Sequence, residues 1–221
     1  TLPRHVADYF SFKTVEELKA ALAESTAKLA ALWQNHEGSE DGFYRRKDVG
    51  AVYILDLAQW HMRRDVSDLL MQNLTEKRGQ GLKVLDYGAG IGTAALMLAD
   101  GNEVDCVEPN RVMQDFAIKR AEALGRSSIR FVSNGVALKD YDLALCVDVL
   151  EHVPNPEKIA QTVASALKPG GLLFTASDFT NDGEHPMHHV SADKLGAMYW
   201  EDVGMKRVSK YWWRKPEGAL V

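Results

Sequence analysis

Residues 84–98 read VLDYGAGIGTAALML, an apolar run followed by three glycines that alternate with small residues. The run has the composition of a buried strand, and the residues after Gly92 are compatible with a helix. Glycines in the turn between them let the backbone approach a ligand closely. In open α/β sheets ligands bind beyond the carboxyl ends of the strands, so this turn is the expected binding site.

After Gly81, short apolar strands alternate with helical patterns. This rhythm is typical of an α/β protein with a doubly wound, mostly parallel sheet that is covered on both faces. We expect strands at 83–88, 103–109, 129–132, 141–148 and 171–177, and one further strand near an edge at 205–215. We expect helices at 93–98, 111–124, 156–167 and 191–203. Residues 219–221 have the composition to begin one more strand.

The first part of the chain has a helical pattern only. Thr14 and Glu17 have capping-box spacing at the start of a helix over 14–33, and a second helical region is expected over 48–74. We therefore divide the chain into an N-terminal helical cap, residues 1–78, and an α/β domain, residues 79–221.

Composition excludes several classes of partner. The net charge is −5 and charges of both signs are interspersed, so there is no basic surface for nucleic acid. No apolar run approaches the roughly 18 residues that span a bilayer. Cys106 and Cys146 lie within strand-like apolar runs, where buried free thiols are usual, and this favours a cytoplasmic protein. We expect a small-molecule partner, and the sequence is compatible with a homo-oligomer.

The spacing of the glycines narrows the range of possible ligands. A triphosphate-binding loop would need a Gly-Lys-Ser or Gly-Lys-Thr end, which is absent. The dinucleotide fingerprint places its third glycine one residue later, where this chain has Thr93. Asp86 stands just before the turn, where a carboxylate would repel a pyrophosphate and attract a ligand with an ammonium group.

Four segments together resemble the class I S-adenosylmethionine (SAM) dependent methyltransferases. They are VLDYGAGIG at 84–92, CVEP at 106–109, YDLALCVDVLEHVPNP at 141–156 and LKPGGLLF at 167–174. The resemblance implies a Rossmann-like fold and transfer of a methyl group from SAM to a small-molecule acceptor by in-line displacement. Three alternatives stay open: cyclisation or elimination of SAM itself, a non-catalytic SAM-binding module, and an NAD oxidoreductase.

The resemblance also implies which residues hold the cofactor: Asp86, Gly88, Gly90, Gly92, Glu108, Pro109, Asn134 and Asp148. The glycines would face the methionine part, and Asp86 its amino group. Glu108 would accept a hydrogen bond from each of the two ribose hydroxyls, and Pro109 would lie against adenine. Many relatives have an acid after the third strand, where this chain has Ser133 and Asn134, and the Asn134 amide is a plausible substitute. Asp148 would flank the reactive methyl group.

Candidate catalytic residues are histidines that follow the fourth and fifth strands: His152, His185, His188 and His189. An imidazole suits the removal of a proton from an acceptor hydroxyl or ammonium group. Glu184 stands beside the last three, but Pro186 interrupts helical ligand spacing, so we expect no metal site.

The cap carries Phe43, Tyr44 and Trp60 with Arg45 and Arg46. The arginines could bind an anionic acceptor, but we expect most of these aromatic side chains to pack the cap onto the sheet and the arginines to be solvated.

Overall fold

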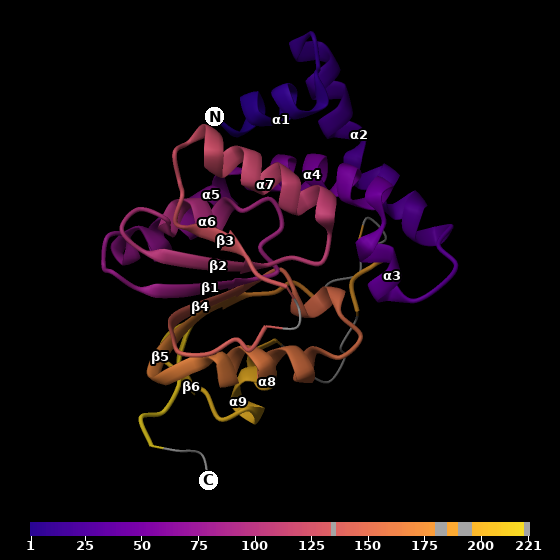
Figure 1. Ribbon diagram of the computed structural model, residues 1–221. Coiled ribbons are helices and arrows are strands. Elements are labelled where there is room, and N and C mark those ends of the chain that lie inside the picture. Colours follow the sequence, from indigo (N-terminus) through magenta and orange to yellow (C-terminus); the bar gives the residue numbers. More distant parts are fainter. Residues whose placement is uncertain (134–135, 180–184, 190–195, 219–221) are drawn as a thin grey trace.

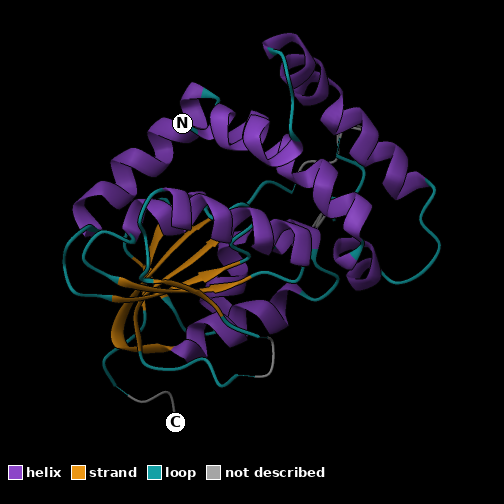
Figure 2. Ribbon diagram, turned by 45° about the horizontal axis from the view of Figure 1, so that its top comes forward, coloured by secondary structure: helices purple, strands orange, loops and turns teal. Residues whose placement is uncertain are grey.

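The structure, a computed structural model, describes residues 1–133, 136–179, 185–189 and 196–218. A central sheet carries helices on both faces, and further N-terminal helices lie beyond one of these faces (Figure 1). The view in Figure 2 shows the strands fanned beneath the helical layers. This is the α/β architecture that the sequence predicts. No helix in the described ranges is long and apolar enough to cross a bilayer.

The N-terminal part is helical throughout. Its elements are α1 (Leu2–Phe10), α2 (Val15–Gln34), α3 (Glu40–Arg45), α4 (Lys47–His61), α5 (Arg64–Leu74) and a 3-10 helix (Thr75–Lys77). The predicted capping box is confirmed: Glu17 N donates to Thr14 Oγ1 at 3.1 Å, and Thr14 N donates to Glu17 Oε2 at 3.3 Å.

The prediction of one continuous helical region over 48–74 is wrong. The chain leaves helical geometry at Arg63, whose ψ of 138° is extended, so α4 ends at His61 and α5 starts at Arg64. The Arg63 guanidinium stacks on Trp60, 4.4 Å from the ring centroid, and pairs with Asp65 at 2.9 Å. These contacts hold the break in place. Helix α3 was not expected, and Ser39 Oγ caps it by accepting from Gly42 N.

Within the described residues the sheet has seven strands in the order β3-β2-β1-β4-β5-β7-β6. They are β1 (Lys83–Tyr87), β2 (Glu103–Val107), β3 (Ile129–Phe131), β4 (Tyr141–Val147), β5 (Leu167–Ala176), β6 (Lys206–Arg207) and β7 (Trp212–Arg214). Strands β1 to β5 are parallel, and β7 is antiparallel to β5. The order reverses between β1 and β4, which is where such sheets bind ligands.

The connecting helices are α6 (Thr93–Leu98), α7 (Arg111–Ala123), a 3-10 helix (Leu150–His152), α8 (Pro156–Ala166) and α9 (Gly196–Asp202). The first, second and fourth of these lie within a residue of their predicted bounds. The single strand expected at 205–215 is two strands, because the chain turns back between β6 and β7 and Val208 N donates to Trp212 O at 2.8 Å. The predicted helix start at Ser191 and the segment 219–221 lie outside the described residues.

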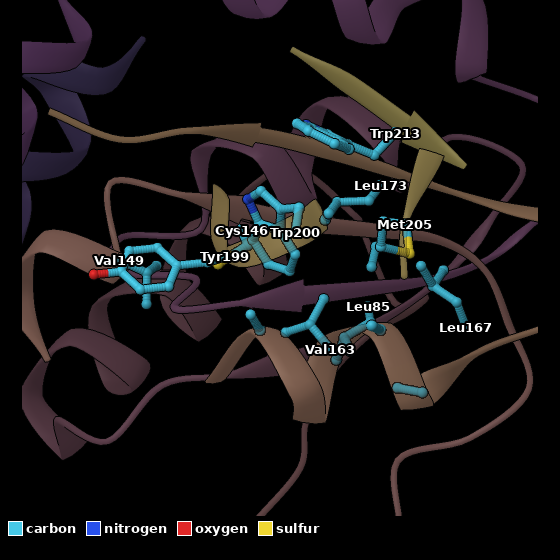
Figure 3. Packing of buried hydrophobic residues seen from close by; sticks show 14 of the residues in the cluster. Leu85, Cys146, Val149, Val163, Leu167, Leu173, Tyr199, Trp200, Met205 and Trp213 are labelled. Atoms are coloured by element: carbon cyan, nitrogen blue, oxygen red, sulfur yellow. The ribbon is translucent and has the colours of Figure 1, made fainter. Parts of the chain in front are cut away.

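Large apolar side chains form a buried cluster between the sheet and helices α8 and α9. Trp200 of α9 and Trp213 of β7 are both 1% exposed and pack with Leu173, Val163 and Met205 (Figure 3). Both cysteines are buried and free, as predicted. The same cluster includes Leu85, Cys146 and Val149, so it supports the carboxyl ends of β1 and β4.

The boundary at residue 78 stays a prediction. Leu70 and Leu74 of α5 are buried in one cluster with Val84 of β1 and Leu98 of α6. Packing therefore groups α5 with the sheet.

Candidate functional site

A cavity of about 220 Å³ lies at the carboxyl ends of β1, β2 and β4, between the sheet and helices α3 to α5. A cavity of roughly 150 Å³ already holds a benzene molecule, so an organic ligand fits here. Six of the predicted cofactor residues line it: Asp86, Gly88, Gly90, Glu108, Pro109 and Asp148. Gly92 does not, and Asn134 lies outside the described residues.

The glycine turn is a tight structure with two different steric demands. Gly88 has a φ of 78°, and a Cβ atom there would overlap the side chain of Val149. Gly92 has a φ of 73°, and a Cβ atom would lie 3.0 Å from Ala117 Cβ of α7. Glycine at position 88 therefore allows Val149 to pack directly against the turn, whereas glycine at position 92 allows α7 to approach it.

The main-chain amides of this turn are engaged within the protein. Gly88 N and Ala89 N donate to Val107 O at 2.8 and 3.0 Å, and Gly92 N donates to Ala89 O at 2.8 Å. Gly90 N donates to Glu108 Oε2 at 2.9 Å. These four amides are therefore already paired before a ligand binds.

One carboxylate oxygen of Asp86 is buried without a hydrogen-bond partner among the described residues. Its side chain is 4% exposed, and its Oδ2 atom accepts no hydrogen bond from the described residues. Burial, opposed in part by a hydrogen bond from the Ala95 backbone, raises the pKa of Asp86 to about 7. A cationic ligand group would remove the cost of this unpaired buried acid, so the site fits the ammonium group of SAM.

Glu108 is held rigidly at the end of β2. Its Oε2 accepts from Gly90 N at 2.9 Å, and its Oε1 accepts from Asn110 N at 2.8 Å. Burial raises the pKa of this carboxyl to about 7, against the effect of both hydrogen bonds. Each carboxylate oxygen can accept a second hydrogen bond, so the group fits a pair of ribose hydroxyls.

Asn110 was missed by the sequence analysis. Its Oδ1 caps α7, and its Nδ2 donates to the carbonyl oxygens of Tyr44 and Arg46 at 2.7 and 2.9 Å. It thereby ties the cap to the strand that carries Glu108. A capping residue directly before a predicted helix was the available signal.

Two acids lie close together after β4, the half-buried Asp148 and the buried Glu151. Asp148 lines the cavity with a φ of 51°, a left-handed conformation that is costly for residues other than glycine. Glu151 is 1% exposed, and its Oε1 accepts from Asp178 N at 2.8 Å. Burial raises the pKa of both carboxyls, and the Asp148 charge raises the pKa of Glu151 further.

Three of the four predicted histidines come together. The ring of His188 lies 4.5 Å from His152, edge to face, and 5.0 Å from His185, stacked. Of these, His152 lines the cavity. His189 leaves the group, because its Nε2 lies 2.9 Å from Glu40 Oε2 of the cap and its main-chain N donates to Glu151 O.

His152 is also a neutral imidazole. Burial, with a contribution from His188, lowers its pKa to about 3. Glu184 lies outside the described residues. Within the described part of the chain no group of three or more His, Cys, Asp or Glu residues is arranged to hold a metal ion.

The cap contributes side chains that sequence reasoning placed only in part. Tyr44 lines the cavity, and its hydroxyl lies 3.2 Å from His152 Nδ1, whereas Phe43 is fully buried against Trp33. Arg45 pairs with Asp41 at 2.8 Å, and Arg46 pairs with Asp48 through both carboxylate oxygens. Neither arginine lines the cavity, and no Lys or Arg is among its described lining residues.

Three further lining residues, Tyr53, His61 and Thr93, were missed. Tyr53 and His61 lie on a helix whose other positions are mostly apolar, and nothing local marks them as site residues. Only the packing of α4 against α6 and α7 brings them to the cavity.

The strand order and a glycine turn between two cavity-lining acids define the class: this is a Rossmann-like, class I SAM-dependent methyltransferase fold. The chain matches the family described as "Methyltransferase domain" over residues 58–216 and belongs to that family. The match starts within α4 and includes α5, in agreement with the packing of α5 on the sheet.

Curated relatives carry a more specific name. The chain is 29% identical over 152 residues to a ubiquinone biosynthesis O-methyltransferase of Methylocella silvestris, which covers 66% of this chain and 58% of that protein. It is 36% identical over 104 residues to the protein of the same name from Actinobacillus pleuropneumoniae, with 42% and 44% covered. The chain thus spans about half the length of these two relatives.

A solved structure shares the fold. Phosphoethanolamine N-methyltransferase 2 of Haemonchus contortus, in complex with SAM, aligns with a TM-score of 0.59 at 17% identity. The alignment covers 76% of this chain and 45% of that one.

Proposed function

We propose that this protein transfers the methyl group of SAM to a hydroxyl oxygen of a small, largely apolar acceptor. The observation that carries the proposal is the composition of one cavity, which joins Asp86 and Glu108 to an aromatic end formed by Tyr44, Tyr53 and His152. The names of the relatives support oxygen as the methylated atom.

In this proposal the sheet side of the cavity holds the cofactor. Asp86 binds the ammonium group, Glu108 binds the ribose hydroxyls, and Pro109 lies against adenine. Gly88 and Gly90 leave room for the methionine part, and Asp148 flanks the methyl group. When bound, SAM supplies an electrophilic methyl group on a sulfonium, so alignment and exclusion of water are the main tasks of the protein.

The cap side receives the acceptor. Its described lining has aromatic and apolar residues but no cationic side chain, which disfavours an acceptor with an anionic group near the reacting atom. His152, neutral at physiological pH, is placed to accept the hydroxyl proton. That proton becomes strongly acidic as its oxygen bonds to carbon, so even a weakly basic imidazole takes it.

We also place the protein in the cytoplasm, in keeping with its free buried thiols Cys106 and Cys146. A small molecule is the partner we expect, rather than nucleic acid or a membrane.

The test is incubation of the purified protein with SAM and a panel of phenols and catechols, with carboxylate-bearing analogues of the same ring size as controls. Formation of S-adenosylhomocysteine together with an O-methylated product from the uncharged acceptors would support the proposal. Release of methylthioadenosine would point to cyclisation or elimination of SAM instead. Intact SAM with every acceptor, despite measurable binding, would favour a non-catalytic module.

A further inference from the structure

A polar chain of three residues reaches the cavity wall beside the glycine turn. His61 Nδ1 lies 2.9 Å from Thr93 Oγ1, and Arg120 Nη1 lies 3.2 Å from the same oxygen. Arg120 also donates to the carbonyl oxygen of Ile91. His61 and Thr93 line the cavity, whereas Arg120 is 6% exposed and lies behind it. Nothing in the proposed cofactor or acceptor contacts uses these three residues.

The hydrogen bonds are compatible with a proton on Nε2 of His61. A guanidinium group only donates, so Thr93 Oγ1 accepts from Arg120, and its own proton is available for His61 Nδ1. Burial, together with the nearby Arg120 charge, lowers the pKa of His61 to about 4, so the ring is neutral. A neutral ring that accepts at Nδ1 carries its proton on Nε2. Among the described residues, Nε2 has no hydrogen-bond partner.

The amino-acid end of SAM carries a carboxylate as well as the ammonium group assigned to Asp86. That carboxylate needs donors, yet the amides of Gly88, Ala89, Gly90 and Gly92 are engaged within the protein. The described cavity lining holds no Lys or Arg. The remaining side-chain donors of the described lining include Tyr44, Tyr53, His61 and His152.

These donors lie in two different parts of the cavity. Tyr44, Tyr53 and His152 form one aromatic group, with ring centroids 5.9 to 6.4 Å apart, and Tyr44 bonds to His152. His61 lies apart from them, against the first turn of α6. The Asp86 carboxyl meets the same turn through the Ala95 backbone. In SAM the carboxylate and the ammonium group are bonded to the same carbon. If the ammonium group binds Asp86, the carboxylate is therefore expected near His61.

We propose that His61 Nε2–H donates to the carboxylate of the amino-acid end of SAM and of S-adenosylhomocysteine, with Thr93 and Arg120 as positioning residues. This inference rests on the proposed function for the identity of the ligand. It adds a specific recognition of the cofactor's carboxylate, through a neutral donor that Thr93 and Arg120 hold in position.

The test compares two ligands by calorimetry: S-adenosylhomocysteine, which has the carboxylate, and methylthioadenosine, which lacks the whole amino-acid chain. His61→Ala is expected to weaken binding of the first about tenfold to a hundredfold, the range for a hydrogen bond to a charged group, and of the second less than twofold. His61→Gln, which keeps an N–H donor, should recover part of the loss. Thr93→Val, which removes the hydroxyl at nearly constant volume, should weaken only S-adenosylhomocysteine.

His36→Ala, a change in a cap histidine that does not line the cavity, is the matched control and should leave both affinities unchanged. Equal weakening of both ligands, or no weakening of either, would overturn the inference and leave the proposed function intact. If the unaltered protein binds neither ligand, the proposed function falls, and this inference with it. Should His61→Ala fail to fold, Thr93→Val and His61→Gln still decide between these results.

Discussion

The main-chain N–H of Gly90 donates a hydrogen bond of 2.9 Å to Oε2 of Glu108, so the glycine turn after β1 is fastened to the end of β2. The other oxygen of Glu108 accepts from Asn110 N, and the Asn110 amide holds the cap through Tyr44 O and Arg46 O. One buried acid thus connects the turn, the second strand and, through its neighbour, the cap. The residue proposed to bind ribose also organises the cavity wall itself.

This double role predicts two separable effects at position 108. Glu108→Ala leaves the N–H groups of Gly90 and Asn110 without their acceptor, so it should lower the free energy of unfolding by about 1–3 kcal/mol. It should also weaken S-adenosylhomocysteine binding at least tenfold. Glu108→Gln retains one oxygen and should keep more of the stability than of the affinity. Thermal unfolding and calorimetry measure the two effects, and normal affinity in Glu108→Ala would contradict the ribose assignment.

Gly92 and Gly88 should respond differently to alanine. Gly92→Ala adds a Cβ atom 3.0 Å from Ala117 Cβ at a φ of 73°, so it should cost about 1–3 kcal/mol of stability and change cofactor affinity little. Gly88→Ala overlaps Val149 at the cavity wall and should lower both quantities. Gly125→Ala is the matched control, because Gly125 has a φ of 66° with no atom within 4 Å of its Cβ position. If Gly125→Ala costs as much as Gly92→Ala, backbone strain alone explains Gly92.

The cofactor side of the site could be predicted because its signals are local. A strand, a glycine turn and an acid at the end of the next strand lie within 84–109, and parallel pairing of β1 with β2 necessarily brings them to one edge. The helices after these strands were also readable: α6 follows the glycine turn directly, and α7 begins at a polar cap, Asn110.

The acceptor side could not be predicted in the same way, because it depends on contacts between distant segments. Tyr53 reaches the cavity only because α4 packs on α7, and Tyr44 because α3 packs on α4. His61, which we assign to the cofactor, depends on the same packing of α4, which breaks from α5 at Arg63. The spacing of the histidines indicated a cluster, but not that His189 would turn away to Glu40 while His188 meets His152.

Tyr44 and His152 should affect the acceptor and not the cofactor. Burial raises the pKa of Tyr44, so its hydroxyl stays neutral. In the proposed role this hydroxyl accepts from Nδ1–H of His152, which leaves Nε2 to take the acceptor's proton. We expect His152→Ala to lower turnover about a hundredfold, the lower range for loss of a general base, and Tyr44→Phe to lower it less. Both should bind S-adenosylhomocysteine within twofold of the unaltered protein. Tyr9→Phe, whose hydroxyl bonds to Asp115 away from the cavity, is the control. Full activity in His152→Ala would show that another group accepts the proton of the hydroxyl.

Cofactor binding should release protons near neutral pH. In the free protein burial raises the pKa of Asp86 to about 7, whereas an ammonium partner favours the ionised form. Binding of S-adenosylhomocysteine at pH 6.5 should therefore release a fraction of a proton, seen as a binding enthalpy that depends on the ionisation enthalpy of the buffer. Asp86→Asn should remove most of this dependence. Equal enthalpies in phosphate and Tris buffers for the unaltered protein would contradict the assignment.

Opposing titrations predict an unusual response of stability to acid. Asp86 has a raised pKa, so the folded state binds more protons than the unfolded state between about pH 4 and 7, and stability falls as pH rises through this window. His61 and His152 have pKa values lowered to about 4 and 3, so there the unfolded state binds more protons. Their contribution is present above about pH 6.5 and is lost as pH falls toward 4, by up to about 1.4 kcal/mol per pH unit for each histidine. The two trends oppose each other in the unaltered protein, and the raised pKa values of Glu108, Asp148 and Glu151 add to the trend of Asp86.

Single variants should separate them. Asp86→Asn removes one contribution to the trend that favours low pH, so the change in its stability between pH 6.5 and 4.5 should be less favourable than that of the unaltered protein. His152→Gln removes one of the opposite trends and should make the protein relatively more stable at pH 4.5. His36→Gln, outside the cavity, is the control for a general effect of replacing a histidine. Urea unfolding at pH 4.5, 5.5, 6.5 and 7.5 gives the four profiles, and parallel profiles for Asp86→Asn and His152→Gln would show that these side chains are not buried as the structure describes them.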